Sequence, residues 1–289
     1  MKAGLPGRRQ FLKLAAASSA TVALGCLGVG YAEHKQIEVS RVEVRLATLP
    51  AQFDGLTIAH LSDIHHGIYT GLEYISHCVE LVNRLKPDLV ALTGDYTLLS
   101  KKYIEPCAAA LRPLRANVGV FAVLGNHDYY QSAGLTAHAL RQAGFTVLIE
   151  GRERLEKRGA KISLLGADDL LYGHWNAARL LGAVPADETR IVLAHNPDFI
   201  GKVAERGQYA DFMMSGHTHG GQVRLPLIGA PHVISDYGQR FVIGLNHLDS
   251  VTGGKGPMQI YTTRGVGAIW MPVRFDCPPE IALYTLRQR

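Results

Sequence analysis

The feature that most constrains the fold of this chain is a set of three apolar runs, each of which ends in polar residues. Two stretches with helical periodicity separate them, at residues 72–88 and 104–116, and the first helix is expected to stop before Pro87. Strands that alternate with helices in this way predict parallel strands joined by right-handed crossovers, and therefore an α/β fold. The runs are LTIAHLSD (56–63), LVALTGD (89–95) and VGVFAVLGNHD (118–128).

The alternation continues past residue 128 and then changes character. Beyond Gln222 the segments FVIG, MQIYTT and EIALYTL predict a second, mixed or antiparallel sheet packed on the first. No linker divides these parts, and a hydrophobic content of 47% is enough to fill the core of one domain over residues 56–289. Residues 33–55 precede it as a linker with strand-like alternation. Between 128 and 222 we expect a helix near 133–143 and strands at 145–149, at 161–169 and from 190 to His195, with a further helix opening near Pro197.

Polar residues recur where these strands end. Asp63 and Asp95 are 32 residues apart and Asn126 follows 31 residues later, intervals that suit one strand, one helix and the return. A lone aspartate at a strand end is usually a helix cap, and Asn-His-Asp is usually a turn. Because the carboxyl ends of parallel strands share one edge of a sheet, however, we expect these groups to meet. The set is Asp63, His65, Asp95, Asn126, His127, Asp128, His195, His217 and His219.

The segment SGHTHGGQVRLP (215–226) places two histidines one residue apart. In extended or loop backbone, His217 and His219 would point to the same side, and the glycines around them leave room for a close approach. Imidazole nitrogens together with carboxylates suit Mn, Fe, Zn or Co better than Ca or Mg. A histidine is more often an ordinary core or surface residue, so the prediction of a metal site depends on partners at the other strand ends.

Residues 1–32 read as an export signal. They hold four basic residues and no acidic one, followed by a small-residue, apolar stretch and a cleavage-like Gly30-Tyr31-Ala32. Arg8-Arg9, with Gln-Phe-Leu-Lys after it, resembles a twin-arginine signal, whose export machinery carries folded proteins across the bacterial inner membrane. We therefore expect an exported, periplasmic or cell-envelope protein.

The fate of this leader has alternatives. Residues 14–32 could stay uncleaved and attach the protein to the outer face of the inner membrane, although their alanine, serine and glycine content is weak for a span. Cys26 could instead be lipidated, but Ala23 stands where a lipobox prefers leucine. The other three cysteines are expected to be buried thiols, with a Cys78–Cys107 disulfide as the alternative outside the cytoplasm.

The formal net charge of +5 belongs to the leader. Without residues 1–32, 26 basic residues face 25 acidic ones, which leaves a net charge of +1. The body therefore offers no overall field for a polyanion, and a nucleic acid is not the partner that its charge favours.

Five short motifs together resemble the signature of calcineurin-like metallophosphoesterases. The segments at 215–226 and 274–286 resemble more narrowly a small bacterial exported branch, which includes twin-arginine phosphodiesterases and relatives of UDP-2,3-diacylglucosamine hydrolase. The resemblance spans residues 56–286 and departs at Ala194, where many members have glycine. It implies a four-layer αββα sandwich of two mixed sheets flanked by helices. The motifs are DIH (63–65), GD (94–95), GNHD (125–128), His195 and GHTH (216–219).

Carried over position by position, the resemblance implies a centre for two divalent metal ions, Mn, Fe, Zn or Co. In such a centre a metal-bridging hydroxide attacks a phosphodiester or pyrophosphate in line, and the substrate is a small molecule or a lipid. By this correspondence Asp63, His65 and His219 would bind one ion, Asn126, His195 and His217 the other, and Asp95 would bridge them.

Four further residues are candidates for catalysis or substrate contact. His127 is expected to protonate the leaving alkoxide, with Asp128 orienting its ring, and a turn or cap is the alternative for Asp128. His66 and Asp169 are candidates for substrate contact at the rim of the site, with surface or capping roles as the alternative.

Two other functions compete with a phosphodiesterase. Hydrolysis of a lipid-linked nucleotide such as UDP-diacylglucosamine is one, and an export signal counts against it because that nucleotide's chemistry is cytoplasmic. A metal-dependent binding module without turnover is the other, and it would be favoured by a missing ligand or acid, none of which is missing.

Overall fold

Two six-stranded sheets form the centre of the computed structural model, which describes residues 28, 30–249 and 257–289. Their strand orders are β1-β12-β2-β3-β4-β5 and β10-β11-β9-β8-β7-β6. The first sheet contains β1 (Glu38–Leu46), β2 (Thr57–Leu61), β3 (Leu89–Thr93), β4 (Gly119–Val123), β5 (Thr146–Val147) and β12 (Glu280–Gln288). The second contains β6 (Gly151–Lys157), β7 (Ala160–Gly166), β8 (Thr189–Leu193), β9 (Phe212–Ser215), β10 (Gly244–Leu248) and β11 (Met258–Thr262).

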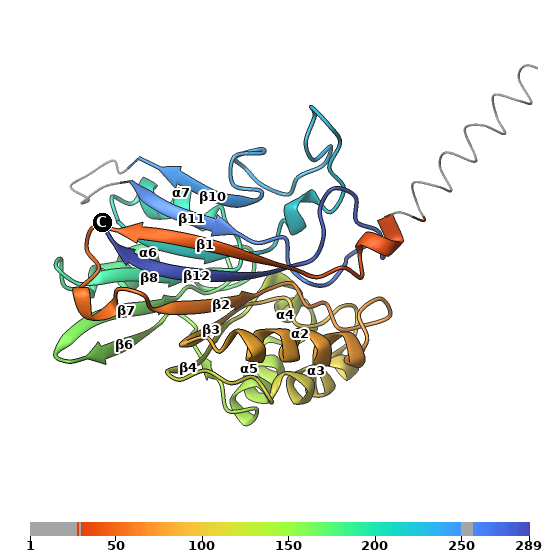
Figure 1. Ribbon diagram of the computed structural model, residues 1–289, viewed down its shortest axis with the longest axis horizontal. Coiled ribbons are helices and arrows are strands. Elements are labelled where there is room, and N and C mark those ends of the chain that lie inside the picture. Colours follow the sequence, from red (N-terminus) through yellow and green to blue (C-terminus); the bar gives the residue numbers. More distant parts are fainter. Residues whose placement is uncertain (1–27, 29, 250–256) are drawn as a thin grey trace, which may run out of the picture.

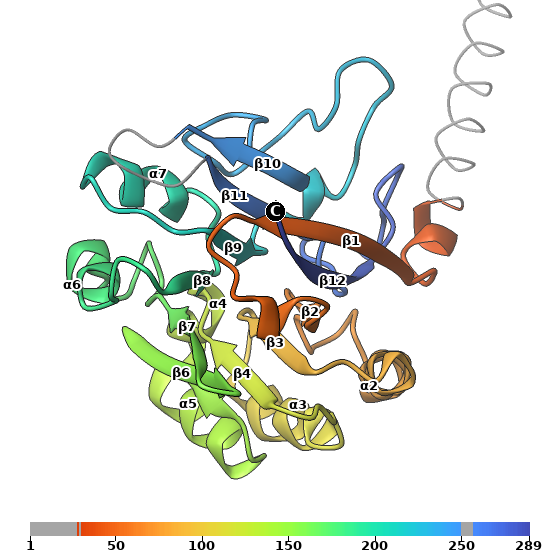
Figure 2. The ribbon, with the colours of Figure 1, turned by 60° about the vertical axis from the view of Figure 1, so that its left-hand side comes forward.

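Helices cover the outer face of each sheet, as Figures 1 and 2 show. Short 3-10 turns lie at η1 (Ala51–Phe53), η2 (Lys101–Tyr103) and η3 (His219–Gly221). The first sheet carries α2 (Leu72–Leu85), α3 (Ile104–Leu111) and α5 (Ala133–Gln142), the second carries α6 (Ala177–Gly182) and α7 (Phe199–Glu205), and α4 (Asn126–Gln131) follows β4. Both sheets mix parallel and antiparallel pairs, so the predicted α/β class with two mixed, helix-flanked sheets is confirmed.

Three separate hydrophobic clusters fill the spaces between the layers. In β3, Val90 and Leu92 pack beneath the helices of the first sheet, whereas Leu89 and Ala91 face the second sheet. All five residues of this strand are buried, which is typical of a parallel strand covered on both faces. This two-sided burial explains why the apolar runs of the sequence predict the strands so directly.

The C-terminal segment corrects the predicted assignment of strands to sheets. EIALYTL was expected in the second sheet, but β12 lies in the first, parallel to β1 and antiparallel to β2. The strand expected at 241–244 was also placed too early, because β10 begins only at Gly244. An apolar run specifies a buried strand but does not specify which neighbour it pairs with.

Several predictions concern the N-terminal leader. The twin-arginine pair Arg8-Arg9 and Cys26 lie outside the described residues, as does most of the 14–32 segment. Among the residues that the structure does describe, no helix is both long and apolar enough to cross a membrane. Cys78, Cys107 and Cys277 are buried free thiols, as predicted, so Cys78 and Cys107 do not pair.

Candidate metal centre

All seven predicted ligands lie at the carboxyl ends of strands, where the edges of the two sheets meet. Asp63 and His65 follow β2, Asp95 follows β3, and Asn126 opens α4 directly after β4. The second sheet contributes His195 after β8 and both histidines of the 217–219 loop after β9. Each of the seven is at most 7% exposed. The sequence prediction that these residues gather at one edge therefore holds, and the edge is shared by two sheets.

The ligand loops have unusual backbone. Asp63, His65, Asp95, His217 and His219 all have positive φ, between 48° and 69°, although none is glycine. Such left-handed conformations cost about 1 kcal/mol or more each and persist where the surrounding structure imposes them, often at functional sites. Sequence periodicity carries no signal for this strain.

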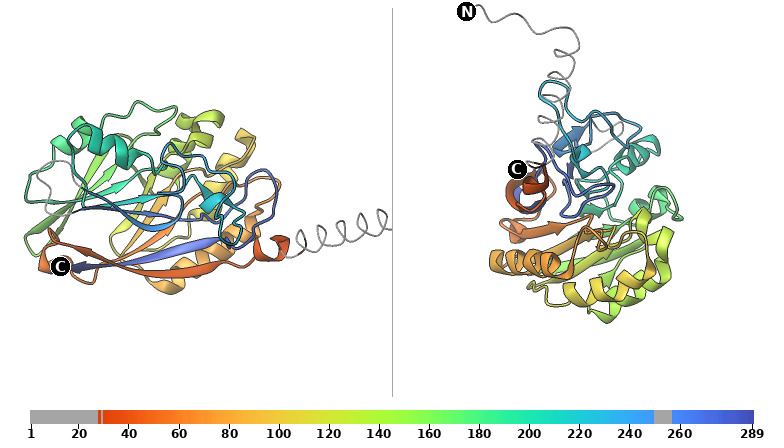
Figure 3. Two further views of the ribbon diagram at one scale, coloured as in Figure 1. Left: turned by 90° about the horizontal axis from the view of Figure 1, so that it is seen from above. Right: turned by 90° about the vertical axis from the view of Figure 1, so that its right-hand side faces the viewer.

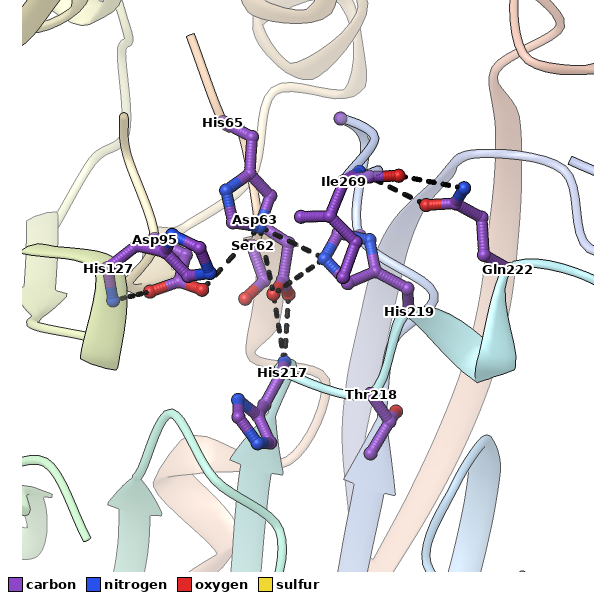
Figure 4. A network of polar contacts seen from close by, with 12 residues as sticks. Ser62, Asp63, His65, Asp95, His127, His217, Thr218, His219, Gln222 and Ile269 are labelled. Carbon is purple, nitrogen blue, oxygen red and sulfur yellow. Dashed lines mark hydrogen bonds and ion pairs between the residues drawn. The ribbon is translucent and has the colours of Figure 1, made fainter. Parts of the chain in front are cut away.

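Left-handed backbone also separates the two histidines of the 217–219 loop. They were expected to point to the same side, but Figure 4 shows the ring of His219 directed toward His65 and Asp63, while the ring of His217 points away from them. The His217 N–H instead donates to both oxygens of Asp63, at 3.0 Å each. The two histidines therefore serve two different groups of ligands.

The first group contains Asp63, His65 and His219. The Nε2 atoms of His65 and His219 lie 3.0 Å apart, and the Nε2 atom of His219 lies 3.4 Å from Asp63 Oδ1. In the second group Asn126 Oδ1 lies 3.1 Å from His195 Nε2 and 2.9 Å from His217 Nδ1. These distances bring acceptor atoms within the range that one ion could span.

Asp95 connects the two groups. Its Oδ2 atom lies 3.5 Å from His65 Nε2 and 3.3 Å from His195 Nε2. Three sets of potential metal ligands each place one donor atom per residue within 4.8 Å of the others, and Asp95 belongs to two of them. The sets are Asp63 with His65 and His219, Asp95 with His65 and His127, and Asp95 with His195 and His217. This is the arrangement that a shared, bridging carboxylate would produce.

The protonation of the imidazoles favours a cation at this site. Burial drives the pKa of His65 and of His219 well below the ordinary value, and it lowers the pKa of His217 to about 4. Neutral rings keep a free lone pair, and the Nε2 atom of His217 is buried without a hydrogen-bond partner. Burial also lowers the pKa of His195, but the facing Asp95 carboxylate outweighs this and raises it to about 10. The carboxylates thus favour a positive charge close by, and the neutral imidazoles offer lone pairs to bind it. A divalent ion fits both features.

The histidine after β8 is further prepared for metal binding. The Nδ1–H of His195 donates to the backbone carbonyl of Thr93 at 2.7 Å, which turns the Nε2 atom toward Asn126 and Asp95 in the cluster. Metal-binding histidines commonly use this hydrogen bond to a carbonyl to fix the ring.

Two motif glycines allow the ligand loops to approach one another. A Cβ at Gly125 would clash with the Asp95 carboxylate, and a Cβ at Gly216 would clash with the Asp63 carboxylate and the Ser62 hydroxyl. The glycines of GNHD and SGHTH are therefore required by close packing against the acids that they neighbour in space.

His127 lies beside the cluster, and Asp128 does not orient it. The His127 N–H donates to Asp95 Oδ1 at 2.9 Å, and its half-buried ring meets His65 edge-on at 4.8 Å. The Asp128 carboxylate instead accepts from the backbone N–H groups of Gly125, Asp95 and Tyr96. Among the described residues no hydrogen bond joins it to the His127 ring, so the alternative of a cap describes Asp128, whose pKa burial and Asp95 raise to about 8.

The two candidate substrate contacts differ. The Nδ1–H of His66 donates to the Thr70 carbonyl, and its buried ring packs against Tyr103, which is a structural position. In Asp169, Oδ1 accepts from the N–H groups of Leu171 and Tyr172, but Oδ2 is buried without a partner. Asp169 lies near enough to His195 for its charge to raise the pKa of that ring.

Sequence reasoning missed a buried arginine below the cluster. Arg274 is completely buried and donates to the carbonyls of Arg264, Gly265 and Gly267, and one of its Nη atoms lies 3.4 Å from His219 Nδ1. It holds the 264–267 loop against Asp63, whose carbonyl accepts from the Gly267 N–H. Its position inside the conspicuous segment at 274–286 was the available signal.

Comparison with known proteins agrees with this geometry. The family described as Calcineurin-like phosphoesterase matches residues 56–221. The chain is 34% identical over 290 residues to the Uncharacterized metallophosphoesterase YkuE of Bacillus subtilis, with 97% of each chain covered. It is 35% identical over 284 residues to Phosphodiesterase YaeI of Escherichia coli, covering 96% of this chain and 98% of that protein.

A solved structure shows the same fold. The 5'-nucleotidase precursor from Thermus thermophilus matches 73% of this chain with a TM-score of 0.50 and 15% identity, and the match spans 49% of its own length. That likeness concerns the fold alone, whereas the family match and the two relatives extend to the motifs that carry the ligands. The chain therefore belongs to the calcineurin-like phosphoesterase family and is a hydrolase, a metallophosphoesterase.

Proposed function

We propose that this protein hydrolyses phosphodiester or pyrophosphate bonds with two divalent metal ions at the centre described above. The observation that carries the proposal is the position of Asp95, whose Oδ2 atom lies within 3.5 Å of a histidine from each ligand group. The name of the relative YaeI, a phosphodiesterase, supports the same class of bond. The mixed nitrogen and oxygen ligands support Mn, Fe, Zn or Co as the ions.

The residues divide the work of such a centre. When bound, the ions would lower the pKa of a water molecule, so that hydroxide is available to attack phosphorus, and would neutralise the phosphoryl oxygens. Asp63 and Asp95 contribute only two negative charges against the four positive charges of two divalent ions, so an excess of positive charge attracts the phosphate anion. Asn126 is a neutral ligand and preserves that excess.

His127 is the residue that we assign to the leaving group. Its backbone is tied to Asp95, and its ring lies between His65 and the exposed Tyr130, at centroid distances of 4.8 and 5.7 Å. A ring beside the cluster is within reach of a bound phosphoester and can give a proton to a departing alkoxide. Asp169, with one buried and unpaired carboxylate oxygen, lies near His195 and is our candidate for contact with the substrate.

Hydrolysis of bis-p-nitrophenyl phosphate tests this function. We expect turnover that requires added Mn²⁺ and two bound ions per chain, and we expect His217→Ala to lose both turnover and one ion. His138→Ala is the matched control, because His138 is an exposed histidine on α5. Two bound ions without turnover would contradict the phosphodiesterase assignment, and an unchanged His217→Ala would contradict the ligand assignment.

We also propose that the protein is exported by the twin-arginine route, supported by the basic, acid-free leader with Arg8-Arg9. Replacing both arginines with lysine should leave the chain in the cytoplasm, as fractionation with an antibody would measure. A double variant found outside the cytoplasm in wild-type amounts would contradict this route.

A further inference from the structure

Large apolar side chains are exposed on the loops that surround the metal centre. Six of them, between 54% and 108% exposed, form what we call the apolar rim. A single exposed leucine needs no explanation, but a contiguous group on a protein of this size marks a surface that binds something. The rim consists of Ile68, Leu99, Leu227, Ile228, Trp270 and Met271.

Contacts between the loops make the apolar rim one surface. The loop of Ile68 is bridged to the loop of Leu99 through His66 and Thr97, and the Leu98 N–H donates to the His66 carbonyl. Ile68 and Pro272 line one shallow cavity, which connects the first two loops with the loop of Trp270 and Met271.

The remaining connection runs through Gln222. Its side chain donates to the carbonyls of Ile269 and Met271 and accepts from the Ile269 N–H, as Figure 4 shows in part beside His219. The turn that carries Leu227 and Ile228 follows directly and is closed by hydrogen bonds between Leu225 and Gly229. The loops that carry the apolar rim are therefore linked to one another from Leu99 to Ile228.

The backbone of the apolar rim holds its side chains outward. Leu99, Leu227 and Trp270 have φ values of 64°, 67° and 64°, in the left-handed region that such residues rarely adopt. With a relaxed backbone, apolar side chains such as these would be expected to turn toward the protein and away from water. Strain of this kind persists where the surrounding structure imposes it, and here it presents three large apolar groups to the outside.

The beginning of the described chain indicates which partner fits. The Gly30 carbonyl accepts from the Arg274 N–H at 3.0 Å, and Tyr31 lines the cavity shared by Ile68 and Pro272. Figures 1 and 3 show residues 30–36 at the end of the molecule where the 266–275 loop also lies. The residues before them in the sequence are apolar and basic, without one acidic residue before Glu33. A chain of that composition enters the fold next to the apolar rim.

Charges near the apolar rim suit an anionic bilayer. Lys101 and Lys102 follow Leu99 and are exposed, and the exposed Lys35 lies over the Tyr31 ring at 4.5 Å. Exposed lysines beside tryptophan, leucine and isoleucine are the composition of surfaces that sit at a membrane interface. We propose that the apolar rim docks on a lipid bilayer, with the metal centre turned toward the headgroups.

Docking does not depend on the proposed function, and it is separate from any attachment through the leader. One consequence does rest on the proposed function: the carboxyl-end loops that bind the ions would face phosphoesters carried at the bilayer surface. His65 and Asp95 lie three and four residues before Ile68 and Leu99 in the same loops.

Tryptophan fluorescence can test docking in the full chain, which has two tryptophans. Trp270 belongs to the apolar rim, whereas Trp175 packs against Phe199 with Arg206 over its ring. The vesicles contain phosphatidylglycerol and phosphatidylethanolamine with brominated acyl chains, which quench tryptophan. When they are added to Trp175→Phe, which retains Trp270, we expect the fluorescence intensity to fall about twofold or more. Trp270→Phe, which retains Trp175, should keep its emission.

Variants of the apolar rim complete the test in the Trp175→Phe background. Leu227→Ser with Ile228→Ser should remove the quenching of Trp270. Val118→Ser should leave it unchanged, since Val118 is also exposed but precedes β4 at the opposite end of the sheet. Chain that sediments with vesicles while Trp270 stays unquenched would show attachment by the leader alone and overturn docking. Failure of the chain to bind vesicles would also overturn docking on a bilayer, and a protein would then be the partner to test for the apolar rim.

Discussion

Both ends of the two sheets hold buried or half-buried acids, but the groups that contact these carboxylates differ between the two ends. At the end where parallel strands begin, Asp88, Glu188 and Asp211 stand one residue before β3, β8 and β9. Each is satisfied by donors: Asp88 by the N–H and hydroxyl of Thr57, Glu188 by Ser163 and Arg152, and Asp211 by Thr48 and the Arg190 N–H.

At the opposite end, Asp63 and Asp95 follow β2 and β3, and their side chains face imidazole rings from both sheets. They also accept from the backbone N–H groups of His217 and His127. Two imidazole nitrogens of the cluster, His65 Nδ1 and His217 Nε2, are buried without a hydrogen-bond partner. This is unfavourable in the protein alone, because each buried polar group without a partner costs about 1–3 kcal/mol. The comparison teaches that burial of acids does not identify the functional edge of a sheet. The buried imidazole nitrogens around them, some without a hydrogen-bond partner, do.

The strongest test of this contrast exchanges one acid at each end. Asp95→Asn should lower kcat/KM for a diester by about 10³-fold or more and reduce bound metal, because it removes charge from the proposed shared ligand. Asp211→Asn should keep both metal and activity, because the Asp211 carboxylate holds Thr48, Tyr209 and the Arg190 N–H and contacts none of the seven ligands. Comparable losses in the two variants would break the distinction between the two ends.

Metal should stabilise one end only. Binding to the folded state alone adds about 2.7 kcal/mol when the free ion is at one hundred times its Kd. We expect Mn²⁺ to raise the unfolding temperature of the wild-type chain and of Asp211→Asn, and a chelator to reverse it. Asp95→Asn should respond weakly. An equal increase in all three, measured by calorimetry, would mean that the ion stabilises the fold from somewhere else.

The acids at the other end should matter for stability instead. Glu188→Gln replaces a carboxylate that accepts from Ser163 and Arg152 at 2.5 and 2.7 Å, and we expect a loss of about 1–3 kcal/mol in the free energy of unfolding. The kcat of the folded variant should be unchanged. If urea unfolding shows no loss while kcat falls, Glu188 belongs to the functional network and not to the scaffold.

Much of this contrast is visible in the sequence, for a physical reason. Parallel strands buried on both faces must be apolar throughout, so β2, β3 and β4 and the polar residues after them could be predicted from local patterns. The predicted ligands lie together because all of them are tied to strand ends. Partner choice is not local, which is why β12 was assigned to the wrong sheet.

Other features could not be predicted from the sequence, because the same residue type can have either a catalytic or a structural role. Asp128 in GNHD reads equally well as a catalytic group and as a cap, and only its contacts with the Gly125, Asp95 and Tyr96 amides decide for the cap. Arg274 looks like a solvated arginine until four backbone carbonyls are found around its guanidinium. Sequence patterns predict where the functional residues lie together, whereas their hydrogen-bond donors and acceptors are known only from the three-dimensional structure.

The smallest expected effect is a pH dependence at the donor-rich end. Burial alone would raise the pKa of Asp88, but hydrogen bonds from Thr57 and Asn117 outweigh it and hold the pKa below the ordinary 3.8. Because the folded value is the lower one, the stabilisation is present above pH 3.8 and is lost as the pH falls through the folded pKa. Asp88→Asn should therefore lose stability at neutral pH and converge with the wild type in acid, as urea unfolding across this range would measure. A constant difference at every pH would show that the acid at the start of β3 acts through packing and not through its charge, which would weaken the contrast at its donor-rich end.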